Sequence, residues 1–90
     1  MFKTKNFSFR YLPSSFLAFS FSISRNLGSA VKRNRLKRRS RAFLSGTLFD
    51  GLSFYCLIRP SGPLQRLHNI REDFIALQQD LLTNLNNKTT

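Results

Sequence analysis

The residues of this sequence best suited to chemistry are a cluster of lysines and arginines between Arg25 and Arg41. Side chains of this kind bind phosphates, because arginine donates paired hydrogen bonds to a phosphate and each neutralised phosphate of a nucleic acid releases counterions. The chain has 15 Lys and Arg against 4 Asp and Glu, and no acidic residue precedes Asp50. The formal net charge of +11 therefore arises in the first half of the chain and predicts a polyanionic partner.

We favour a nucleic acid as this partner, with an anionic lipid surface and a merely solvated helix face as the alternatives. In a helix, Lys37 would have like charges four residues away on both sides, at Arg33 and Arg41, and such pairs destabilise an isolated helix. A solvated face usually mixes charges of both signs, so this repulsion favours an anionic ligand. A basic, serine-rich N-terminus without acidic residues is also typical of organelle transit peptides, which is a competing interpretation.

Catalytic chemistry is not expected from this chain. His68 is the only histidine, Cys56 is the only cysteine, and the four carboxylates do not have the spacing of metal ligands. We expect His68 at the surface or at a helix cap, and Cys56 as a small buried hydrophobic residue. We therefore assign no catalytic residue and no metal ligand, and the single cysteine favours a reducing, cytoplasmic location.

A membrane-spanning segment is also not expected. The longest apolar run, from Phe16 to Ile23, is interrupted by two serines and is too short to cross a bilayer. A cationic cluster follows this run, where a secretory signal would have a cleavage site with small residues. We predict neither secretion nor a membrane partner.

Two strands are predicted before the cationic cluster. Alternating aromatic residues in 7–11 indicate the first strand, and the turn residues in 13–15 indicate a hairpin to a second strand over 17–24. The second strand has one bulky face, which we expect in the core, and one face of small residues, which we expect to form the floor of a groove. The bulky face consists of Leu17, Phe19, Phe21 and Ile23, and the small face of Ala18, Ser20, Ser22 and Ser24.

The cluster itself is predicted to be helical. Ser29 suits a helix N-cap and Gly46 a helix C-terminus, with a helix of about four turns between them. Its apolar stripe is narrow, consisting of Leu36, Phe43 and Leu44 with Ser40 between them, so only one edge can be buried.

The second half of the chain predicts one more strand and one more helix. The mostly apolar run 52–58 indicates a central strand covered on both faces, and apolar residues at helical spacing over 70–81 indicate an amphipathic helix. The predicted fold is α+β, a two-layer α/β sandwich with the order β-β-α-β-α. We expect a single RNA-binding domain over residues 1–90, with a core of about 7–83 and a polar C-terminal tail at 84–90, and we infer no obligate protein partner.

The basic segment resembles the signature of the bacterial ribonuclease P protein component, in the sequence SISRNLGSAVKRNRLKRRSRAF. The residues that fit the family pattern are Ser24, Arg25, Leu27, Gly28, Ala30, Val31, Arg33, Asn34, Arg35, Lys37, Arg38 and Arg41. The similarity continues to the strand that ends in Arg59 and Pro60. The chain resembles a short form of the family, without the usual N-terminal helix.

The resemblance implies the protein subunit of a ribonucleoprotein endoribonuclease that removes the 5′ leader of precursor tRNA. The implied partners are ribonuclease P RNA and precursor tRNA, and the chemistry and the Mg²⁺ belong to the RNA. The resemblance also implies that the basic helix lies in a left-handed β-α-β crossover, an exception to the usual handedness. Charge alone supports an alternative, a general ribosomal-type structural RNA-binding protein with no role in cleavage.

The resemblance also implies two sets of site residues. The RNA-subunit-binding residues would be Arg25, Lys32, Arg33, Asn34, Arg35, Lys37, Arg38, Arg39 and Arg41. The leader-binding residues would be Ser20, Ser22 and Ser24.

Overall fold

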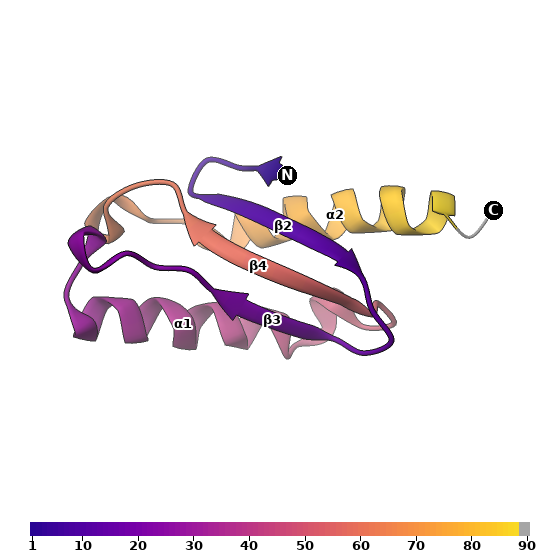
Figure 1. Ribbon diagram of the computed structural model, residues 1–90, viewed down its shortest axis with the longest axis horizontal. Coiled ribbons are helices and arrows are strands. Elements are labelled where there is room, and N and C mark those ends of the chain that lie inside the picture. Colours follow the sequence, from indigo (N-terminus) through magenta and orange to yellow (C-terminus); the bar gives the residue numbers. More distant parts are fainter. Residues whose placement is uncertain (89–90) are drawn as a thin grey trace.

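Four strands form one mixed sheet, and two helices lie behind it in the view of Figure 1. The computed structural model describes the backbone of residues 1–88 and the side chains of residues 1–84. The strands are β1 (Phe2–Lys3), β2 (Phe7–Pro13), β3 (Ala18–Phe21) and β4 (Phe54–Pro60), and the helices are α1 (Ala30–Leu44) and α2 (Ile70–Lys88). Three short 3-10 helices connect them, namely η1 (Arg25–Leu27), η2 (Thr47–Phe49) and η3 (Leu64–Arg66).

The predicted α+β class and the order of the main elements are confirmed, with the short edge strand β1 as an addition. The predicted hairpin of the first two strands is wrong. The order in the sheet is β1-β2-β4-β3, so β4 lies between β2 and β3 and pairs with both. The link between β2 and β3 therefore spans two strand spacings, about 10 Å.

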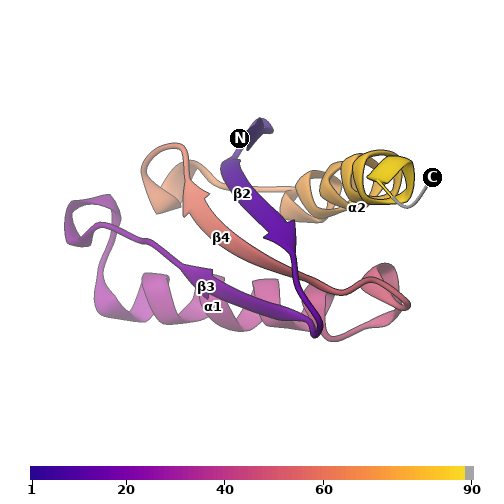
Figure 2. The ribbon, with the colours of Figure 1, turned by 45° about the vertical axis from the view of Figure 1, so that its right-hand side comes forward.

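The connection from β3 through α1 to β4 is a parallel β-α-β unit. In Figure 1, β3 and β4 both run to the left, β4 lies above β3, and α1 lies behind them. A crossover that passes behind the sheet in this direction is left-handed, as the resemblance implies and against the usual preference. Figure 2 shows the same arrangement from a second side.

The prediction that the central strand is covered on both faces is also wrong. Alternate residues of β4 are buried, namely Phe54, Cys56, Ile58 and Pro60, whereas Tyr55 and Arg59 between them are exposed. Both helices pack against the same face, so the other face of the sheet has no covering layer in the described structure. The run looks mostly apolar because Tyr55 and Leu57 occupy two of the uncovered positions.

The core lies between the sheet and the two helices. Phe7 and Phe9 of β2 each place their ring centroid 5.5 Å from that of Phe74 on α2, and Phe43 of α1 stacks on the same ring at 5.4 Å. Leu77 of α2 is also fully buried, and each buried side chain of this size stabilises the fold by roughly 1.5–3 kcal/mol. The bulky residues of β3 pack against this core but are only partly buried, because β3 is an edge strand.

Helix α2 continues to Lys88, so the polar tail predicted from residue 84 begins inside the helix, and its last two residues lie outside the described part. In residues 1–88, neither helix is both long and apolar enough to cross a membrane.

Candidate nucleic-acid interface

Helix α1 begins and ends close to where its sequence indicates. The Ser29 hydroxyl accepts a hydrogen bond from the backbone N–H of Lys32 at 3.3 Å, which satisfies one of the free donors of the first turn. At the other end, the backbone N–H and the hydroxyl of Ser45 both donate to the Arg41 carbonyl, at 2.8 Å and 2.7 Å. The helix buries only Leu36, Ser40 and Leu44, which recur every four residues along one edge.

Most of the predicted RNA-subunit-binding residues are exposed. Arg25 lies in η1 and the other eight lie on α1, which contains no acidic residue. The exposed residues of this set are Arg25, Lys32, Asn34, Arg35, Arg38, Arg39 and Arg41. Lys37 is half-buried.

Arg33 differs from the rest of the set. It is half-buried, and its guanidinium Nη1 donates to the Gly28 carbonyl at 2.9 Å. This hydrogen bond connects the first turn of α1 to the chain that enters it. Arg33 therefore supports the position of the basic helix as well as adding to its charge.

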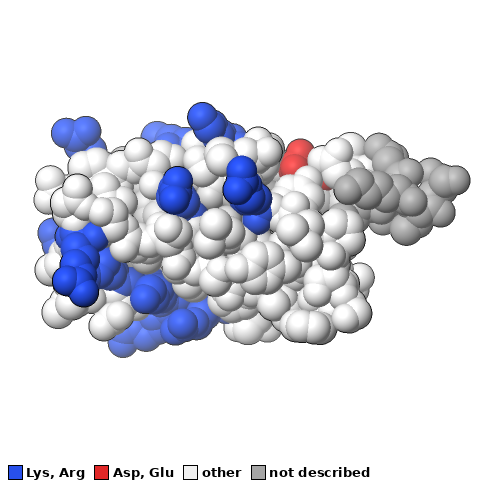
Figure 3. Space-filling view, viewed as in Figure 1, with Lys and Arg blue, Asp and Glu red and all other residues white. Residues whose placement is uncertain are grey.

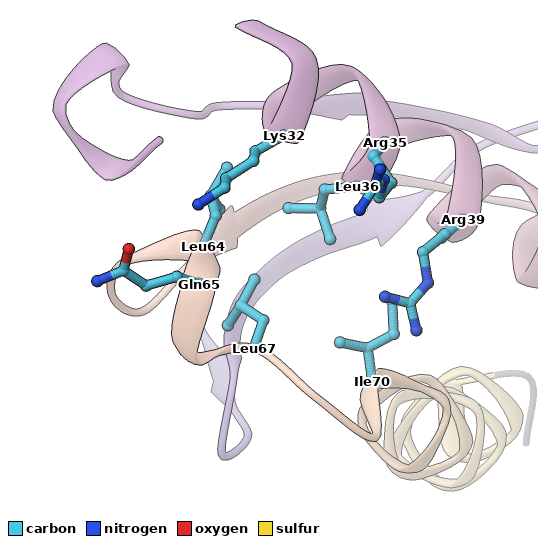
Figure 4. A pocket seen from close by; sticks show the side chains of 8 residues that line it. All are labelled: Lys32, Arg35, Leu36, Arg39, Leu64, Gln65, Leu67 and Ile70. Atoms are coloured by element: carbon cyan, nitrogen blue, oxygen red, sulfur yellow. The ribbon is translucent and has the colours of Figure 1, made fainter. Parts of the chain in front are cut away.

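The cations of α1 lie on two sides of the helix. Lys32, Arg35 and Arg39 line a pocket between α1, η3 and the start of α2 (Figure 4). On the opposite side, the guanidinium carbon of Arg41 lies 5.8 Å from the centroid of the Phe21 ring of β3, close enough for a cation–π contact. The cations of α1 therefore reach from the pocket beside η3 to the edge of the sheet at β3.

The uncovered side of the sheet, here called the open face, carries a second group of cations that was not predicted from the sequence. Arg10 of β2 and Arg59 of β4 lie on it, because each is the outward neighbour of buried residues in its strand. With Ser8 and Leu57 they line a pocket of about 130 Å³. Figure 3 shows this face, with blue groups in the middle of the sheet and along the lower left edge, and one small red group.

The signal for Arg10 and Arg59 was present in the sequence. Side chains alternate between the two faces of a strand, so Arg10 lies on the same face as Ser8, and Arg59 on the same face as Leu57, opposite the buried residues. A central strand covered on both faces, as predicted from its apolar residues, would leave no open face on which these two cations could lie together.

The three predicted leader-side serines lie along β3 and the segment that follows it. The hydroxyl oxygen of Ser20 lies 2.7 Å from the hydroxyl oxygen of Tyr55, on the open face. The backbone N–H of Ser22 donates to the Ile58 carbonyl at 2.9 Å, which extends the pairing of β3 with β4. The hydroxyl of Ser24, which is exposed, donates to Asn26 Oδ1.

The surroundings of Cys56 and His68, the two residues considered for catalysis, agree with the structural roles predicted for them. Cys56 is fully buried in β4, as predicted, and burial raises the pKa of its thiol to about 12. His68 is exposed, as predicted, and its Nδ1 lies 3.0 Å from the Arg66 carbonyl. In the described residues no three His, Cys, Asp or Glu side chains gather as a metal site would require.

Comparison with known proteins places this geometry in a known context. The family model described as Ribonuclease P matches residues 1–85. No curated protein sequence shows significant similarity to the chain.

Two solved structures share the fold. The ribonuclease P protein from Thermotoga maritima in complex with 1-(4-fluorophenyl)-2-thiourea has a TM-score of 0.60 and 21% sequence identity, over 91% of this chain and 78% of that chain. A second structure of the ribonuclease P protein from Thermotoga maritima has a TM-score of 0.60 and 20% identity, over 91% of this chain and 76% of that chain.

Proposed function

Because the chain belongs to the ribonuclease P protein family, we propose that its helix α1 docks on ribonuclease P RNA while its open face holds the 5′ leader of precursor tRNA. Members of this family are accessory subunits of the ribonucleoprotein endoribonuclease that matures the 5′ ends of tRNA, so ribonuclease P RNA and precursor tRNA are its partners. The family match does not favour the alternative of a general ribosomal-type RNA-binding protein.

The observation that supports this assignment of surfaces is the contact between Arg41 and Phe21. It joins the basic helix to the strand at the edge of the open face, so the two cationic surfaces adjoin each other at β3. An RNA subunit bound along α1 would therefore bring a substrate strand directly to the open face.

We propose that the exposed cations of α1 contact phosphates of the RNA subunit. Each such contact releases condensed counterions, and no acidic residue of α1 competes for the cations. The proposed set remains Arg25, Lys32, Arg33, Asn34, Arg35, Lys37, Arg38, Arg39 and Arg41, with Arg33 also bracing the helix through Gly28.

On the open face, we propose that Arg10 and Arg59 contact leader phosphates. The half-exposed ring of Tyr55 lies in the same sheet face and offers a surface on which a base can stack, a contact worth about 1–3 kcal/mol per base. The hydrogen bond between the hydroxyls of Ser20 and Tyr55 holds the Tyr55 side chain in place, which gives Ser20 a positioning role. Ser22 and Ser24 would line the margin of this track.

The chemistry of cleavage is proposed to reside in the RNA. Two of the four carboxylates are already engaged within the fold, since Asp73 accepts hydrogen bonds from Asn6 and Asp80 accepts one from Tyr11. The donor set of the described chain therefore does not suit Mg²⁺, and we place the ion on the RNA, where it would activate the attacking water. The buried, unpaired Cys56 agrees with a reducing location, and we propose the cytoplasm.

The test is multiple-turnover cleavage of precursor tRNA by ribonuclease P RNA at low Mg²⁺, with and without the protein. We expect the protein to restore cleavage at the correct 5′ end. No stimulation at any protein excess would refute the proposed function.

A second assay separates the two surfaces. Replacing Arg10 and Arg59 by alanine is expected to reduce the preference of the holoenzyme for precursor over mature tRNA, because only the precursor has a leader. The matched control, Arg35→Ala with Arg38→Ala, also removes two arginines and, at saturating protein, should keep this preference. If the control and the test variant lose it equally, the open face does not bind the leader.

A further inference from the structure

A pocket of about 180 Å³ lies between α1 and η3 (Figure 4). One of its walls is cationic and consists of Lys32, Arg35 and Arg39. The rest of the lining is mostly apolar and consists of Leu36, Leu64, Leu67 and Ile70, with Gln65 as its polar member. The pocket lies on the helix side of the sheet, away from the open face.

The cationic wall follows from helical geometry. Lys32, Arg35 and Arg39 are separated by three and four residues, so their side chains lie in a row along one edge of α1. All three are exposed. The pocket has no acidic lining residue, so their charge is not neutralised there.

The apolar wall is held firmly. Leu36 and Leu64 are only 6% and 8% exposed, so they are anchored in the core and present only a small surface to the pocket. At Gly28, a Cβ would lie 2.9 Å from Leu64 Cδ1, which shows how closely η3 packs against the entrance to α1. The position of η3 against the start of α1 is therefore fixed by close packing.

The combination of walls specifies the chemistry of the occupant. A free phosphate would use the cations but leave the half-buried Leu67 and the exposed edge of Leu64 in contact with water, and an apolar ligand would leave three cations without a partner. An unstacked nucleotide has both a flat, weakly polar base and a flanking phosphate. The exposed amide of Gln65 at the pocket can donate to and accept from a base edge.

We propose that this pocket takes one unstacked nucleotide of the RNA subunit, with its base against Leu64 and Leu67 and its flanking phosphates on the α1 cations. This inference rests on the proposed function, because it names the nucleotide contact by which α1 docks. Recognition of single-stranded bases by splaying them onto protein surfaces is common in RNA binding.

Site-directed crosslinking tests the proposal in the assembled ribonucleoprotein. The one native cysteine, Cys56, is fully buried, so a photoreactive azidophenacyl group can be attached selectively to a new cysteine in Gln65→Cys. The matched control is Gln79→Cys, at an exposed position of α2. We expect Gln65→Cys to crosslink to one single-stranded nucleotide of ribonuclease P RNA, and Gln79→Cys not to reach it. Crosslinks that are scattered, that fall in base-paired RNA, or that do not form would overturn the proposal.

A binding measurement separates apolar from ionic contacts. Leu67→Ala should weaken binding to ribonuclease P RNA by roughly tenfold, because it removes apolar surface that the base would bury, without changing the salt dependence, because no cation is removed. Leu82→Ala, a matched truncation of a 40% exposed leucine on α2, should bind like the wild type. Unchanged affinity of a folded Leu67→Ala would refute the pocket, and the crosslinking result stands independently if that variant does not fold.

The proposed function and the nucleotide pocket fail in different ways. If the wild-type protein does not prefer ribonuclease P RNA over an unrelated structured RNA at the same salt, the proposed function is wrong. If the wild type shows the preference but the Leu67 and Gln65 experiments give no effect, only the nucleotide pocket is wrong.

Discussion

Ser40 is an unfavourable residue at its position. Its side chain is fully buried in the middle of α1, and its hydroxyl is the one buried side-chain group in the described residues without a hydrogen-bond partner. A buried hydroxyl that forms no bond has left water without compensation, which costs free energy. The apolar stripe of the basic helix is therefore interrupted at its centre.

We expect Ser40→Ala to stabilise the protein by about 1–2 kcal/mol, since alanine removes the unpaired hydroxyl and favours a helix. The matched control on the same helix is Ser29→Ala, which removes the N-cap bond to Lys32 and should destabilise by about 1 kcal/mol. Urea unfolding of both variants measures whether each substitution raises or lowers the free energy of unfolding. A destabilised Ser40→Ala would mean that the hydroxyl has a partner.

Cys56 predicts a pH dependence. Burial raises the pKa of its thiol from 9.0 to about 12, so the unfolded chain loses this proton at lower pH than the folded chain. The resulting contribution to stability is complete below pH 9 and is lost as the pH rises from about 9 to about 12. The wild type loses this contribution as the pH rises, and Cys56→Ala has no thiol to lose it. The difference in unfolding free energy between the wild type and Cys56→Ala should therefore become smaller between about pH 9 and pH 11. A difference that stays constant over this range would contradict the assignment.

At the scale of elements, different sides of helix α1 have different roles. Its buried edge attaches it to the core, and its cations project on both sides of that edge. Arg38 lies on the side opposite Leu36 and Ser40, so it projects farthest from the sheet. A helix with so narrow a buried edge depends on tertiary contacts, since its like charges disfavour it in isolation.

We expect Arg35→Ala with Arg38→Ala to weaken binding to ribonuclease P RNA and to reduce the slope of log affinity against log salt by about 0.7–0.9 for each phosphate that is no longer neutralised. Arg10→Ala with Arg59→Ala, which removes the same charge from the open face, should leave both quantities unchanged when no precursor tRNA is present. Affinities measured over a series of salt concentrations give both slopes. An unchanged slope for the α1 variant would mean that these two side chains do not bind phosphates.

At the scale of the whole molecule, polar contacts join the chain at and just before β2 to the last helix, α2. The buried carboxylate of Asp73 on α2 accepts from the backbone N–H of Asn6 at 3.0 Å and from its Nδ2 at 2.8 Å, and Nδ2 also donates to the His68 carbonyl. At the far end of β2, the Tyr11 hydroxyl donates to Asp80 at 2.5 Å. Burial, followed by this bond, raises the pKa of Tyr11 to about 12. Helix α2 is therefore attached to the sheet near both ends of β2, through Asp73 at one end and Asp80 at the other.

We expect Asn6→Ala to destabilise the protein by about 2–3 kcal/mol, because it leaves a buried carboxylate and a carbonyl short of a donor. Asn34→Ala, at an exposed position of α1, is the matched control and should change stability by no more than about 0.5 kcal/mol. Chemical denaturation measures both. If Asn6→Ala destabilises the protein no more than the control does, the Asp73 contact is not needed to attach α2.

Local residue patterns were sufficient to predict the main strands, the two long helices and the concentration of positive charge on α1. The spacing of Leu36, Ser40 and Leu44 and the cap at Ser29 depend on neighbours within a few turns, so the sequence shows them directly. The alternation of Phe7 and Phe9 indicated a strand for the same reason. The family resemblance added the crossover, which periodicity does not encode.

The pairing of strands was decided only in three dimensions. A short turn predicts a hairpin because neighbouring strands usually pair, yet β4, from a distant part of the chain, inserts between β2 and β3. This insertion also determines which faces are covered, and hence that Arg10 and Arg59 share the open face with Tyr55. Which layer covers a strand depends on where the whole chain packs its helices.

By itself, then, the sequence determined the elements, the charge and the identity of the basic helix, because these depend on residues close together along the chain. Only the tertiary structure decided the sheet order, the open face, and the pocket that η3 closes against α1. These features bring together residues from distant segments, such as Lys32 with Leu67 and Arg10 with Arg59, and only the packing of the elements positions such residues side by side.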